Sequence, residues 1–71
     1  MNRIEGKLCP LCKESGVNIS LKRDVNDPSD VLCKCKNLHI FGVEGLGINV
    51  LHSSKEEDKG RRFSIAELQN A

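Results

Sequence analysis

Four cysteines, arranged as two close pairs, constrain this 71-residue chain more than any other feature of its sequence. The stretch LCPLC places Cys9 and Cys12 in a C-x₂-C pair, and the later stretch CKC contains Cys33 and Cys35. A chain of this length buries only ~60% of the surface that it exposes when unfolded, so its core alone stabilises it marginally. Small domains compensate with disulfides, a metal ion or a partner surface. The paired cysteines are therefore the first features to consider as a source of the missing stability.

The apolar content of the chain is low for a domain that must fold around its core alone. Only 38% of the residues are apolar, with two Phe and neither Tyr nor Trp. Aromatic side chains bury the largest areas in protein cores, so their scarcity favours a further source of stability. The 11 Lys and Arg residues nearly balance the 10 Asp and Glu residues, and the formal net charge is +1. This balance differs from the strongly basic composition of many nucleic-acid-binding modules.

The N-terminal residues 1–8 lack the apolar run of ~7–15 residues that a secretory signal requires. No apolar stretch approaches the ~18–20 residues that span a bilayer. We therefore expect a cytoplasmic, intracellular protein that does not enter a membrane. Disulfides are rare in that compartment, where clustered cysteines more often bind a metal ion.

The two cysteine pairs have the spacing of zinc ligands. Zinc prefers four sulfur or imidazole donors in a tetrahedron, and a C-x₂-C turn presents two sulfurs to one ion. Pro10 fixes its own backbone angle inside the first pair. Alternate residues of a strand share a face, so a strand would present the second pair together. The preferred ligands are therefore Cys9, Cys12, Cys33 and Cys35.

A second ligand set stays open because His39 follows Cys35 with C-x₃-H spacing. In this alternative His39 replaces Cys33, which becomes a buried residue without a metal. Either set closes the coordination sphere, and a closed sphere is typical of a structural ion. Structural Zn²⁺ contributes ~10–16 kcal/mol in zinc-finger peptides. Because a domain is stable by only ~5–15 kcal/mol, we expect one structural zinc to supply most of the folding free energy.

The hydrophobic pattern predicts a β-rich body over residues 1–52. Residues 17–22, 31–36 and 46–50 alternate apolar and polar side chains with the period of half-buried strands. Residues 53–62 form a charged stretch that we interpret as a loop. The segment 63–71 is predicted to be a short helix, because Ser64 and Glu67 have the spacing of a capping box.

The pattern C-x₂-C-x₂₀-C-x-C resembles that of the zinc-ribbon superfamily from Cys9 to Phe41, and CPLC is similar to one of its knuckles. The resemblance implies a small antiparallel sheet stabilised by zinc, here with a short C-terminal helix. CPLC is also similar to a rubredoxin knuckle. However, CKC is a poor second knuckle and the chain has few aromatic residues, which favours zinc over iron.

The function expected from these features is a non-catalytic zinc-binding module that mediates a protein–protein interaction. Small proteins that resemble it act as adaptors, including regulators of transcription machinery. No spacing organises Ser, His and Asp residues into a catalytic set, and a closed metal site leaves no position for an activated water. The alternative is a nucleic-acid-binding ribbon with five basic residues on its surface: Lys13, Lys22, Arg23, Lys34 and Lys36.

Overall fold

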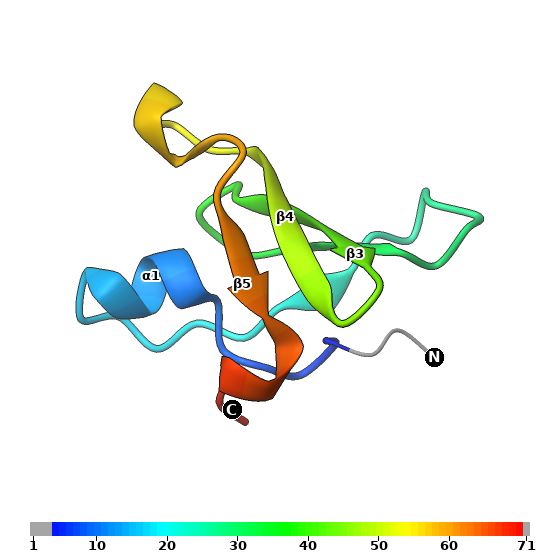
Figure 1. Ribbon diagram of the computed structural model, residues 1–71, viewed down its shortest axis with the longest axis horizontal. Coiled ribbons are helices and arrows are strands. Elements are labelled where there is room, and N and C mark those ends of the chain that lie inside the picture. The colour runs from blue at the N-terminus through cyan, green and yellow to red at the C-terminus, as the bar shows by residue number, and fades with distance from the viewer. Residues whose placement is uncertain (1–3, 71) are drawn as a thin grey trace.

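An antiparallel sheet of five strands, paired in chain order, organises the part of the protein that the computed structural model describes, residues 4–70 (Figure 1). The strands are β1 (Lys22–Arg23), β2 (Leu32–Lys34), β3 (Ile40–Glu44), β4 (Gly47–His52) and β5 (Arg62–Ser64). One short helix, α1 (Pro10–Glu14), and two 3₁₀ turns, η1 (Glu56–Asp58) and η2 (Ile65–Glu67), complete the described elements. The prediction of a small β-rich domain is confirmed.

The β3–β4 hairpin is the centre of the sheet. Its turn includes Gly45, whose φ of 61° lies in the left-handed region that glycine adopts without strain. At the start of β4, a Cβ on Gly47 would lie 3.0 Å from the carbonyl oxygen of Phe63. Glycine at this position therefore lets β5 approach β4 closely.

The segment predicted as a strand over residues 17–22 is only partly built into the sheet. β1 contains Lys22 and Arg23, while the residues before it pair with the N-terminal segment. Leu21 donates its backbone N–H to the carbonyl of Lys7 at 2.7 Å, and Cys9 donates to Ile19 at 2.7 Å. These bonds hold the N-terminal segment beside the first strand and position the first cysteine pair.

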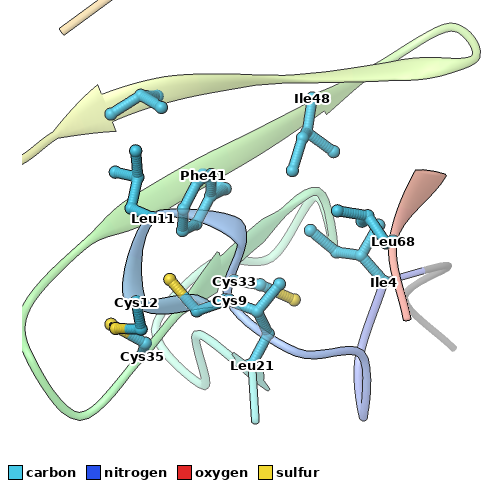
Figure 2. Close-up of a cluster of buried hydrophobic side chains, with 11 residues drawn as sticks. Ile4, Cys9, Leu11, Cys12, Leu21, Cys33, Cys35, Phe41, Ile48 and Leu68 are labelled. Carbon is cyan, nitrogen blue, oxygen red and sulfur yellow. The ribbon is translucent and has the colours of Figure 1, made fainter. Parts of the chain in front are cut away.

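The core lies on one face of the sheet, where side chains of β3 and β4 meet the N-terminal segment, α1 and the C-terminal tail (Figure 2). Phe41 is fully buried, and Ile48 and Val50 continue the same face on β4. The remaining buried members are Ile4, Cys9, Leu11, Cys12, Leu21, Cys33, Cys35 and Leu68. The four cysteines are thus part of a core that contains a single fully buried aromatic side chain.

The predicted C-terminal helix over 63–71 is not observed. Arg62–Ser64 forms β5, in which Phe63 pairs with Ile48, and within the described residues up to 70 the only helical element that follows is the 3₁₀ turn η2. Ser64 makes no side-chain capping hydrogen bond. Long-range pairing explains the difference, because Leu8 donates its N–H to the carbonyl of Gln69 at 2.7 Å. An isolated helix of two turns is only marginally stable. The sheet contacts provide hydrogen bonds for the backbone groups that such a helix would have used.

The charged stretch 53–62 is an ordered connection that ends in β5. Ser53 is buried, and its hydroxyl accepts a hydrogen bond from the N–H of Lys55 at 3.2 Å. Lys59 forms an ion pair with Glu56 at 3.0 Å beside η1. Within residues 4–70, every helix is too short to cross a membrane.

Candidate metal centre

Three cysteines and one histidine from two distant segments converge on one point. Cys9 precedes α1, Cys12 lies within α1, and Cys35 and His39 lie between β2 and β3. Their four ligand atoms all lie within 4.8 Å of one another. The three cysteines are buried and His39 is half-buried, so the group is close enough and enclosed enough to hold one metal ion.

Four distances within this group are close to those expected around a tetrahedral ion. Zn–S bonds of ~2.3 Å and Zn–N bonds of ~2.0 Å place neighbouring ligand atoms about 3.5–3.8 Å apart in a tetrahedron. The Sγ atoms of Cys12 and Cys35 are 3.7 Å apart. The Nδ1 atom of His39 lies 3.6 Å, 3.5 Å and 3.2 Å from the sulfurs of Cys9, Cys12 and Cys35, respectively. The residues present therefore fit a four-coordinate metal site.

α1 and the residue directly before it present the first two candidate ligands. Pro10 occupies the first turn, where its missing N–H costs no intrahelical bond, and Lys13 donates its N–H to the carbonyl of Cys9 at 3.0 Å. Residues three apart lie on the same face of a helix. This single turn therefore directs Cys9 and Cys12 to the same point.

A tight turn presents the other two ligands. Cys35 donates its N–H to the carbonyl of His39 at 3.0 Å, and Leu38 donates to the carbonyl of Cys35 at 3.1 Å. Leu38 has a φ of 67°, which is uncommon for a non-glycine residue. The ring of His39 packs against Phe41 in an edge-to-face arrangement at 6.5 Å. The hydrophobic core thus supports the orientation of the imidazole.

Asn37 contacts two of the sulfurs, a role that was not predicted from the sequence. Its backbone N–H donates to the Sγ of Cys35 at 3.3 Å, and its Nδ2 donates to the Sγ of Cys12 at 3.4 Å. Donors to sulfur stabilise thiolates and orient metal ligands. The side-chain hydrogen bond links the two pairs of candidate ligands. The only sign of it in the sequence is the presence of an amide side chain two residues after Cys35.

Burial makes the thiols of Cys9 and Cys12 difficult to ionise without a cation. Burial is the largest influence that raises the pKa of Cys9 above its ordinary value, and it does the same for Cys12. The hydrogen bond from Asn37 opposes this effect by lowering the pKa of Cys12. A bound metal ion would supply the positive charge that buried thiolates need.

Cys33, a member of the predicted four-cysteine set, does not belong to this group of ligand atoms. Its side chain is fully buried on β2, near Ile4 and Leu21, while Cys12 and Cys35 lie together at the other end of the core (Figure 2). Burial raises the pKa of the Cys33 thiol to about 11. At neutral pH Cys33 is therefore a protonated thiol that packs like a small apolar side chain.

The basic residues of the alternative prediction lie in different places. Lys22 and Lys34 are direct cross-strand partners, and with Lys36 they line an open groove of about 590 Å³. Arg23 instead forms an ion pair with Asp30 at 3.6 Å. A further basic residue, Lys13, lines a separate groove beside α1.

Arg61 holds α1 against the C-terminal half of the chain. Its guanidinium donates to both carboxylate oxygens of Glu14, at 2.8 Å and 2.7 Å, and to Asp58 at 3.2 Å. It also lies 5.0 Å from the centre of the Phe63 ring. The Arg61 bonds lower the pKa of Glu14 and keep its carboxylate charged.

No protein-family model, curated protein or solved structure matches this chain. We therefore infer function from the geometry of the site and from the surfaces around it.

Proposed function

We propose that the protein is a non-catalytic binding module of the zinc-ribbon kind, stabilised by one structural zinc, that docks onto a protein partner. We propose a role as an adaptor or regulator of transcription machinery by analogy with other small ribbon-like proteins. The observation that carries the proposal is the closed group of four protein ligands, drawn from two segments that the ion would fasten together. The proposed ligands are Cys9, Cys12, Cys35 and His39.

The ligand set supports a structural ion over a catalytic one. Catalytic zinc commonly keeps three protein ligands and one position for water, whereas Cys₃His is a structural set. Soft thiolates together with imidazole suit zinc. In this set the three thiolates and Zn²⁺ change the formal charge by −1, from +1 to about 0. The loaded protein would therefore have little net charge to direct it toward phosphate-rich partners.

Apolar side chains on the exposed face of the sheet support a protein partner. A Cβ placed on Gly42 would lie 3.0 Å from Leu51 and 3.6 Å from Leu32, so both leucines lie over this glycine. Leu51 remains 52% exposed. Apolar surface of this kind gains free energy when a partner covers it.

Native mass spectrometry of the purified protein, with and without chelator, tests the proposal directly. We expect one zinc per chain, loss of the folded charge-state distribution on chelation, and a co-purifying protein bound to the zinc-loaded form. Iron in the site, or a chain that stays folded and partner-bound after chelation, would contradict it.

Nucleic-acid binding is the second proposal, and the groove lined by Lys22, Lys34 and Lys36 favours it. Like charges directly opposite each other destabilise a sheet, so an anion between Lys22 and Lys34 would relieve a cost of folding. Binding of a labelled single-stranded oligonucleotide should then weaken steeply as salt rises. The double variant Lys34→Glu and Lys36→Glu should abolish it, while Lys59→Glu, outside the groove, should not. Equal binding by both variants would exclude the groove.

A further inference from the structure

The outer edge of β5 has backbone groups that form no backbone hydrogen bond within residues 4–70. β5 is the last strand of the sheet, and its register pairs Phe63 with Ile48 and Arg62 with Asn49. The N–H of Val50 bonds to the carbonyl of Arg61, two residues before Phe63. Because hydrogen-bonded and non-hydrogen-bonded pairs alternate in an antiparallel ladder, the backbone of Arg62 faces away from β4.

The same alternation applies to Ser64, which pairs with Gly47. Its N–H faces outward, while its carbonyl begins the turn η2. Within residues 4–70, no backbone hydrogen bond reaches the N–H or carbonyl of Arg62 or the N–H of Ser64 from the open side. The N–H and carbonyl of Arg62 and the N–H of Ser64 therefore have the spacing that an added antiparallel or parallel strand could pair with.

An apolar groove lies beside this edge, between α1 and the C-terminal segment. Figure 1 shows α1 on the side of β5 away from β4. The groove has a volume of about 240 Å³, below the ~300–1,000 Å³ of small-molecule pockets, so its size suits a single side chain. Its apolar walls are Leu8, Pro10, Phe63 and Leu68.

The rim of the groove carries two opposite charges. Lys13 on α1 and Glu67 on η2 are exposed, and neither forms an ion pair with another residue of the described chain. A third rim residue, Glu14, is neutralised by Arg61 at 2.7 Å, which also fixes α1 against β5. A ligand with an anion near Lys13 and a cation near Glu67 would complement this rim.

We propose that β5 accepts an extended segment of a protein partner as an added strand. One apolar side chain of the segment enters the groove beside Phe63, with an acidic residue toward Lys13 and a basic residue toward Glu67. Main-chain hydrogen bonds to Arg62 and Ser64 supply affinity, and the groove and its rim supply specificity. The inference depends on the proposed role in protein binding and names the surface used.

The substitution Ser64→Pro tests whether the N–H of residue 64 donates a hydrogen bond to the added strand. Ser64 has a φ of −77°, which proline adopts, and its N–H faces the open side, so Ser64→Pro should leave the ladder to β4 intact. Ser64→Ala is the matched control, since it removes the hydroxyl and keeps the N–H. Equal zinc content and equal melting temperature of the two variants would establish that both fold.

The probe is a phage-displayed library of random linear peptides, selected against the zinc-loaded full chain. We expect enriched peptides with one apolar residue between an acidic and a basic residue. Binding should slow amide hydrogen exchange at Arg62 and Ser64. Ser64→Pro should weaken binding roughly three- to tenfold relative to Ser64→Ala, the effect of one lost hydrogen bond.

Several results would overturn the inference. Equal affinity of the two variants for the peptide, or protection of amides near Lys22 and Lys34 instead, would place peptide binding elsewhere and leave the protein-binding role intact. Self-association that Ser64→Pro abolishes would show that a second copy occupies the edge. Failure to enrich any peptide would also count against strand addition. Failure of the proposed protein-binding role could be distinguished from failure of this inference, because no protein would then co-purify with the wild-type chain either.

Discussion

Two regions of the molecule, the proposed metal-binding end and the β5 end, are held together by different chemistry. At the metal-binding end, α1 and the turn before β3 meet through the side chains of Cys9, Cys12, Cys35 and His39. At the β5 end, Phe63 is held by a ladder to Ile48. In the proposed metal-loaded form, the first end depends on an ion to neutralise buried thiolates, whereas the second uses neutral backbone bonds. We therefore expect stability in this small chain to depend on the metal at the first end and on backbone pairing at the second.

The difference extends to the charged side chains. The ion pairs of Arg61 with Glu14 and Asp58 are partly exposed, and exposed pairs contribute only ~0–1 kcal/mol. A structural zinc contributes about ten times more. We therefore expect changes at the metal-binding end to affect folding as a whole and changes near β5 to have graded effects.

Loss of a metal ligand should have the largest effect. Structural zinc contributes ~10–16 kcal/mol in zinc-finger peptides, and domains are stable by only ~5–15 kcal/mol, so Cys35→Ser or His39→Ala should abolish cooperative unfolding. Circular dichroism and zinc content would measure this. Cys33→Ser is the control, which should keep one zinc and cost ~1–3 kcal/mol for a buried hydroxyl. A Cys33→Ser protein without zinc would contradict the ligand assignment.

Truncation of Phe63 should have the next largest effect. It should lower the free energy of unfolding without changing zinc affinity appreciably. Removal of a fully buried Phe costs ~3–5 kcal/mol, and Phe63 is half-buried, so Phe63→Ala should cost about 2 kcal/mol. Urea unfolding at saturating zinc would measure the loss. Zinc affinity should change by less than threefold. A large loss of zinc affinity would show that the two ends are not independent.

Removal of the Asn37 side chain should weaken metal binding without unfolding the zinc-loaded protein. Asn37→Ala deletes the donor to the Cys12 sulfur, and loss of an outer-shell donor lowers metal affinity by ~10–100-fold. Competition with a chromophoric chelator would measure the affinity. Asn26→Ala, in an exposed turn, is a control expected to leave it unchanged. If zinc affinity is unchanged in Asn37→Ala, the Asn37 amide does not contribute to metal binding.

Substitution of Asp27, in the turn between β1 and β2, should change the free energy of unfolding least. Its effect should depend on pH differently from the loss of a metal ligand. Backbone N–H groups of Val31, Leu32 and Ser29 lower the pKa of Asp27, with that of Val31 first in effect. A lowered folded pKa contributes stability that is present above ~3.9 and lost as pH falls through the folded value. The stability difference between wild type and Asp27→Asn should therefore stay constant from about pH 7 to about pH 5.

Urea unfolding at those two pH values checks this expectation. Any stability that both proteins lose together in that range would then belong to protonation of the metal ligands. A difference that shrinks above pH 5 would contradict the lowered pKa of Asp27.

Parts of the fold and of the site could be predicted from short-range patterns. The C-x₂-C pair was predicted as a ligand pair, and it needs only one turn of chain. The choice between Cys33 and His39 depends on where β2 ends. β2 stops at Lys34, so Cys35 already belongs to the following turn and lies beside His39. Strand alternation, which placed Cys33 and Cys35 on one face, does not continue past the end of a strand.

The C-terminal segment illustrates the opposite case. Ser64 and Glu67 have capping-box spacing, but the pairing of Phe63 with Ile48 involves residues distant in sequence. Local propensity is a weak prior that tertiary pairing overrides. The role of Asn37 was equally hidden, because its bond to Cys12 crosses between the two halves of the ligand set.

The pairing of Lys7 with Asn70 has a mechanical consequence. Leu8 is bonded to Gln69 on one side, and its chain neighbour Cys9 is a proposed metal ligand. Tension on the tail is therefore transmitted through one peptide unit to the ligand shell. The rate of metal exchange would then report whether the tail is seated, and a factor that peels the tail away would accelerate zinc transfer to an acceptor.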